Sequence, residues 1–65
     1  MIYNNKFFKT RSEAEAFKKE HGGVLITTEK KDRGRFVTEM LVALDARGET
    51  VHPDQTPYCV AWNGR

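Results

Sequence analysis

The residues best suited to bind a metal ion or to attack a substrate are His21, His52 and Cys59. Structural zinc sites use four Cys or His ligands at short, regular spacings, and these three residues fit no such spacing. Cys59 stands between Tyr58 and Val60 in an apolar segment, where a thiol is usually buried and unreactive. We therefore expect no metal, no cofactor and no catalytic residue, and we interpret the chain as a protein that is not an enzyme.

A cluster of cations offers a second kind of chemistry, the binding of phosphate groups. Four of them lie close together in the polar segment 29–35, namely Lys30, Lys31, Arg33 and Arg35. Lys and Arg side chains at such spacings can contact successive phosphates of a nucleic acid. However, Glu29 and Asp32 dilute the cluster, and the net charge of the whole chain is only +2. Nucleic-acid binding through residues 30–35 is therefore the alternative function rather than the leading one.

Protein binding requires fewer special residues, and three aromatic side chains are suitable anchors for it. These are Tyr3, Tyr58 and Trp62. Aromatic residues contribute much of the binding energy at protein interfaces, although in a small domain they also close the core. We expect an unidentified protein partner or self-association, and no small-molecule substrate, because 65 residues leave little room for a ligand pocket.

One helix is predicted at residues 11–21, after the segment Thr10-Arg11-Ser12-Glu13, which has the pattern of a capping box. Gly22 and Gly23 follow it, and glycine readily adopts the left-handed conformation that ends a helix. Segments rich in β-branched and aromatic residues predict strands elsewhere. The predicted strands and turns are Met1–Tyr3 and Lys6–Phe8 around an Asn4-Asn5 turn, Val24–Thr28, a hairpin loop over Glu29–Arg35, a long strand from Phe36 to Leu44, a turn over Asp45–Gly48, a loop over His52–Pro57 and a last strand over Tyr58–Trp62.

The segment from Phe8 to Phe17 has the pattern F-x-T-x-x-E-A-x-x-F. It resembles the strand-to-helix step of the arm DNA-binding domains of phage-type integrases and of many small phage proteins. The resemblance covers ten of 65 residues and implies no functional residue here. It suggests an accessory protein, adaptor or inhibitor of the sort carried by phages and mobile elements.

Together these patterns predict one α+β domain over residues 1–65, with three to five mainly antiparallel strands and one helix on one face, in the order β–α–β–β–β. The longest apolar run, residues 40–44, is far too short to cross a bilayer, so we expect no membrane association. A single cysteine and the absence of a signal-peptide pattern at the first residues favour a cytoplasmic location. The leading function is a small non-enzymatic binding protein that acts through protein contacts.

Overall fold

In a computed structural model, the chain forms three strands and two helices; the backbone of residues 2–64 and the side chains of residues 4–63 are described. The elements in chain order are β1 (Ile2–Phe8), α1 (Arg11–His21), β2 (Val24–Thr27), α2 (Arg33–Arg47) and β3 (Tyr58–Gly64). The predicted α+β class is confirmed, whereas the predicted order β–α–β–β–β is wrong, because the observed order is β–α–β–α–β.

The last strand of the chain lies at the centre of the sheet. The strand order is β1–β3–β2, and both neighbours run antiparallel to β3. The β1 ladder pairs Ile2 with Gly64 at one end and Phe8 with Tyr58 at the other. The shorter β2 ladder begins with Val24 opposite Ala61. Every strand pairing within the described residues therefore depends on β3.

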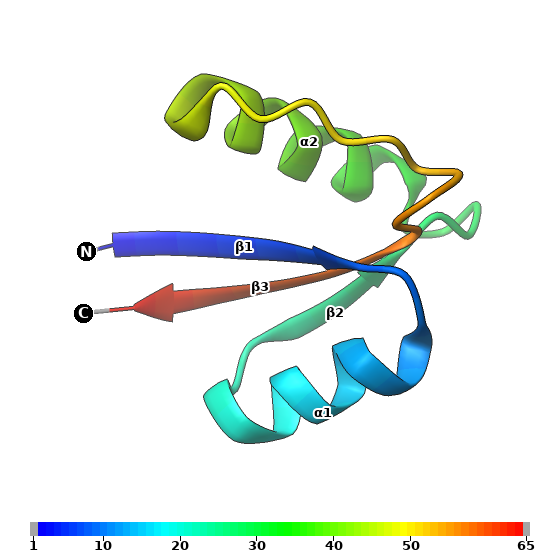
Figure 1. Cartoon of the computed structure of the whole chain (residues 1–65), viewed down its shortest axis with the longest axis vertical. Coiled ribbons are helices and arrows are strands. Elements are labelled where there is room, and N and C mark those ends of the chain that lie inside the picture. The colour runs from blue at the N-terminus through cyan, green and yellow to red at the C-terminus, as the bar shows by residue number, and fades with distance from the viewer. Residues whose placement is uncertain (1, 65) are drawn as a thin grey trace.

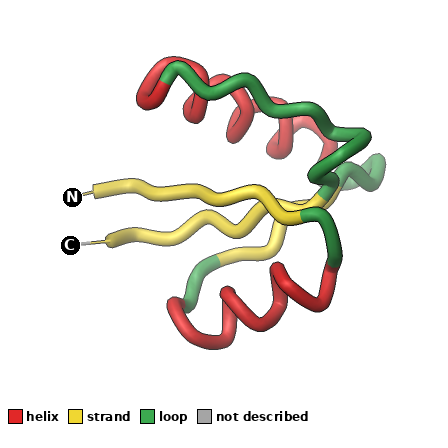
Figure 2. The backbone as a smooth tube through the Cα atoms, in the orientation of Figure 1, coloured by secondary structure: helices red, strands yellow, loops and turns green. Residues whose placement is uncertain are grey.

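The two helices cover opposite faces of this sheet, so the domain has three layers (Figures 1 and 2). Consecutive residues of β1 show the division, since side chains alternate between the faces of a strand. The ring of Phe7 contacts Phe36 of α2 at 5.5 Å, and the ring of Phe8 contacts Phe17 of α1 at 5.2 Å. The α2 face holds the buried cluster of Ile26, Phe36, Cys59 and Ala61, with Phe7 and Met40 packed against it.

Helix α1 has the predicted bounds, and its ends are formed as the sequence indicates. The hydroxyl of Thr10 accepts a hydrogen bond from the backbone N–H of Glu13 at 3.2 Å, which satisfies one donor of the first turn. Gly22 ends the helix with φ 78°, and its N–H donates to the carbonyl of Lys18 at 2.7 Å. Ala14 is fully buried against the sheet.

Helix α2 replaces the long strand predicted from Phe36 to Leu44, and this is the largest correction to the predicted fold. Apolar residues at consecutive positions were interpreted as the two buried faces of a central strand. In the helix, Phe36, Glu39 and Ala43 point inward at spacings of three and four residues. The second face of the sheet, for which the predicted fold has no helix, is covered by α2. The predicted turn at Asp45–Gly48 is the end of this helix, where Gly48 adopts the left-handed conformation at φ 65°.

Two further predicted turns are absent. The Asn4-Asn5 pair continues β1 without interruption, because the side chain of Asn5 is buried and bonded to α2 rather than exposed at a turn. The predicted hairpin loop Glu29–Arg35 is a short turn that leads into α2 at Arg33. The strand at 24–28 and the last strand are confirmed as β2 and β3, and residues 52–57 form the predicted loop. Neither helix of the described chain is long and apolar enough to cross a membrane.

Candidate protein-contact surface

The outer side of α2 carries three large apolar side chains that are about half exposed. Val37 is 46% exposed, Leu41 is 55% exposed and Leu44 is 47% exposed. Their spacing of four and three residues places them on one side of the helix, roughly 120° around the axis from the residues that face the sheet. We call these three residues the α2 stripe. The stripe is the outward apolar face of a helix whose other apolar face is already buried.

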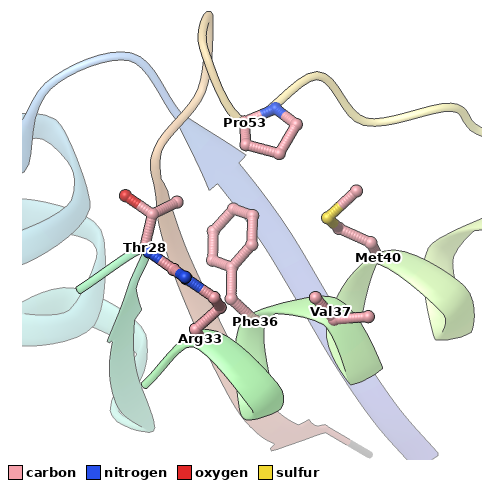
Figure 3. A pocket seen from close by; sticks show the side chains of 6 residues that line it. All are labelled: Thr28, Arg33, Phe36, Val37, Met40 and Pro53. Carbon is pink, nitrogen blue, oxygen red and sulfur yellow. The ribbon is translucent and has the colours of Figure 1, made fainter. Parts of the chain in front are cut away.

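A pocket of about 350 Å³ opens beside the first residue of the α2 stripe. Its lining residues are Thr28, Arg33, Phe36, Val37, Met40 and Pro53. Figure 3 shows Pro53 on the far side of the pocket from α2, with the ring of Phe36 between them. Because Val37 belongs to both the pocket wall and the α2 stripe, the two form one continuous apolar surface. Arg33 provides a single charge at its margin.

A buried polar cluster holds α2 against the first strand. The side-chain N–H groups of Asn5 donate to the backbone carbonyl of Glu39 at 3.1 Å and to its carboxylate at 2.8 Å. The guanidinium of Arg47 donates to the amide oxygen of Asn5. Asn5 is 5% exposed and Glu39 is 4% exposed, so the two bonds between them are shielded from water, whereas the bond from Arg47 is only partly buried. Buried polar groups with satisfied hydrogen bonds fix the packing of neighbouring elements, and here they fix which side of α2 faces outward.

The start of α2 is attached to the end of β2 by a second, smaller set of hydrogen bonds. The carboxylate of Asp32 accepts a bond from the hydroxyl of Thr27 at 3.2 Å and one from its backbone N–H at 3.4 Å. Asp32 is the residue before the helix, yet its side chain makes no bond to the first turn. Its carboxylate therefore orients the chain as it enters α2, next to the pocket.

The predicted phosphate-binding cluster is divided between a turn and a helix. Lys30 and Lys31 lie in the turn before α2, and Arg33 and Arg35 lie in its first turn, all with exposed side chains. Two residues on a helix that are separated by two positions point about 160° apart, so Arg33 and Arg35 extend to different sides. The ammonium group of Lys31 also lies 3.7 Å from the carboxylate of Glu29. The structure thus gathers these cations at one end of α2 but does not direct them toward one surface.

Two of the three predicted aromatic anchors lie in β3 and are half-buried. Trp62 packs against Phe17 of α1 with ring centroids 4.9 Å apart, and His21 lies 6.0 Å from it. Tyr58 is also half-buried, at the beginning of the strand. The side chain of Tyr3 lies outside the described residues. The tryptophan therefore closes the space between the sheet and α1, on the opposite side of the molecule from the α2 stripe.

The thiol of Cys59 is fully buried on the α2 face of the sheet. Burial raises its pKa from 9.0 to about 12, and the nearby carboxylate of Glu39 adds to this increase. A hydrogen bond from the Lys6 backbone and the charge of Arg47 act in the opposite direction. The thiol is therefore protonated at neutral pH. Within the described residues, no three His, Cys, Asp or Glu side chains lie close enough together to hold a metal ion.

The α2 stripe and its pocket were missed at the level of sequence. Side chains alternate along a strand, so the predicted strand from Phe36 to Leu44 separates Leu44 from Val37 and Leu41 and hides their common side. The spacing of four and three residues was present in the sequence, but it overlapped with the inward pattern of Phe36, Met40 and Ala43. Two apolar faces on one helix produce a nearly continuous apolar run, and such a run does not distinguish a helix from a buried strand.

In comparisons of this chain with protein-family models, with curated proteins and with solved structures, no match was found.

Proposed function

We propose that this domain is a non-enzymatic protein-binding module whose contact surface is the α2 stripe together with the adjoining pocket. One observation carries the proposal: three large apolar side chains, each about half exposed, adjoin an apolar pocket on the outer side of one helix. Surfaces of this kind, with a polar margin, mark the places where proteins bind other proteins. Single exposed apolar residues would need no such explanation.

Site-specific photo-crosslinking in the native host tests this function. The photoreactive residue p-benzoylphenylalanine at position 41 would be compared with the same residue at position 16, where Ala16 is exposed on α1. We expect a discrete crosslinked product from position 41 and none from position 16. Equal or absent crosslinking at the two positions would show that the α2 stripe is not a protein-contact surface.

A further inference from the structure

We infer that the partner at the α2 stripe is a second copy of this chain, bound with its own α2 antiparallel to the first. This inference rests on the proposed function, because it names the occupant of the same surface. In such a pair, a twofold axis passes beside Leu41, and each residue of the stripe meets a residue of the second stripe. Twofold dimers of this type are the commonest assemblies of soluble proteins.

The spacing of the stripe is suited to a helix of the same sequence. Val37, Leu41 and Leu44 repeat at four and three residues, which is the pattern along which two helices pack at a small angle. With Leu41 at the axis, Leu44 of each copy lies opposite Val37 and Thr38 of the other. Leu44 therefore comes to the edge of the pocket that Val37 lines, so one stripe supplies both the apolar side chain and the site that receives it.

The charges at the two ends of α2 are complementary in the antiparallel arrangement. Residues 29–35 hold four cations and two carboxylates, a net charge of +2, whereas residues 45–49 hold Asp45, Glu49 and Arg47, a net charge of −1. Antiparallel pairing places the basic end of each helix against the acidic end of the other. Parallel pairing would bring the two basic ends together and would align the helix dipoles unfavourably.

The stripe itself contains no charged position, so its contact with a second stripe leaves no buried charge unpaired. The nearest cation of the helix on the pocket side, Arg33, lies at the margin, and Arg47 is already bonded to Asn5 and to Glu49. Interfaces commonly have this distribution, with an apolar centre and a polar rim. Helix α2 therefore supplies both the apolar centre and the charged rim that a second α2 would contact.

Sedimentation equilibrium of the purified chain, from about 1 µM to about 1 mM, tests the inference. We expect the mass of the larger species to be twice 7.5 kDa. Leu41→Glu places two carboxylates together at the twofold axis, and Leu41→Lys places two ammonium groups there. Each variant alone should weaken dimerisation at least about tenfold. An equimolar mixture of the two should recover the dimer, because the carboxylate and the ammonium group then form an ion pair.

Ala46→Glu is the matched control, since Ala46 is exposed on a different side of the same helix. It should leave the dimer intact, and circular dichroism should show that all variants keep the native helix content. A wild-type chain that is monomeric throughout, or a dimer that neither Leu41 variant weakens, would overturn the inference. If the monomeric chain still crosslinks from position 41 to a different protein, the proposed function stands without it. If no crosslink forms either, both are wrong.

Discussion

At the scale of single residues, the structure places its least common features in the interior of the α2 face. Asn5 and Glu39 form a buried polar pair near Cys59, and the exposed side chain of Arg47 donates to Asn5. None of these residues belongs to the α2 stripe. Their effect on function is indirect, because they hold α2 in the orientation that exposes the stripe.

Replacing Asn5 with Ala removes the donor of two hydrogen bonds to Glu39 and one of the two acceptors of the Arg47 guanidinium, which also donates to Glu49. We expect Asn5→Ala to lower the free energy of unfolding by about 2 kcal/mol, since it removes two buried hydrogen bonds between β1 and α2. Asn63→Ala is the control, because Asn63 is an exposed amide of the same sheet, and it should change stability by less than about 0.5 kcal/mol. Urea unfolding measures both, and equal losses would contradict the role given to Asn5.

The buried thiol gives a pH dependence with a defined sign. The folded-state pKa of Cys59, about 12, lies above its ordinary value of 9.0, so folding favours the protonated thiol. Its contribution to stability is complete below pH 9 and is lost as the pH rises toward 12. We expect the free energy of unfolding to fall more steeply over this interval in the wild type than in Cys59→Ala. Parallel curves for the two proteins above pH 9 would show that Cys59 is not responsible.

At the scale of elements, the predictions succeeded where local chemistry decides the structure and failed where packing decides it. Helix α1 was found with its bounds because Thr10 and Gly22 mark its ends by hydrogen bonding and by backbone conformation. Helix α2 lacks such a signal at its start, since the Asp32 side chain bonds to Thr27 instead. Its identity depends on which apolar residues the sheet buries, and that information is not local.

The candidate sites were also predicted only as far as local sequence allows, because the position of each side chain depends on the element that carries it. The basic cluster at residues 30–35 was visible in the sequence because charges are conspicuous, but its division between a turn and a helix was not. The α2 stripe was invisible because its members had been assigned to opposite faces of a strand. Recognition of a contact surface therefore required the correct element first.

Gly23, the residue before β2, lies against the backbone of β3, and a substitution there tests this close contact. Gly23 adopts φ 110°, and a Cβ atom there would lie 2.3 Å from the carbonyl oxygen of Ala61 and 2.9 Å from the Cβ of Trp62. We expect Gly23→Ala to destabilise the domain by at least about 2 kcal/mol, because both the backbone and the contact with β3 must shift. Thermal unfolding followed by circular dichroism measures the change.

Gly34→Ala is the matched substitution in α2, where a Cβ atom would meet nothing within 4 Å. Since alanine favours a helix over glycine, this variant should be more stable than the wild type by roughly 0.5–1 kcal/mol. A stabilised Gly23→Ala variant, or a strongly destabilised Gly34→Ala variant, would be inconsistent with the observed path of the chain.

At the scale of the whole molecule, the basic cluster suggested by the sequence and the contact surface found in the structure are neighbours that share Arg33. The cations gather at the start of α2, and the α2 stripe follows them along its outer side. The proposed protein contact uses the apolar side chains and leaves Lys30 and Lys31 free for solvent. The alternative function, nucleic-acid binding, can therefore be tested separately.

A fluorescence-anisotropy titration with labelled duplex and single-stranded nucleic acid carries out that test. Because Arg33 and Arg35 diverge, we expect no more than about three phosphate contacts, hence weak binding that disappears between low and physiological salt. Binding in the micromolar range at physiological salt, abolished by the double variant Lys30→Ala and Lys31→Ala, would instead make nucleic acid the principal partner. Asn63→Ala serves as the control, since it changes an exposed residue and leaves every charge unchanged.

The central position of β3 also determines when the domain can fold during its synthesis. Residues 58–64 leave the ribosome after β1 and β2, and within the described residues both of those strands pair only with β3. Closing the ladder from Ile2 to Gly64 joins residues that are far apart in the chain, which makes the nucleation of the sheet slow. Both sheet ladders therefore form only after residues 58–64 are translated, and a nascent chain that stops before Tyr58 lacks the strand with which β1 and β2 pair.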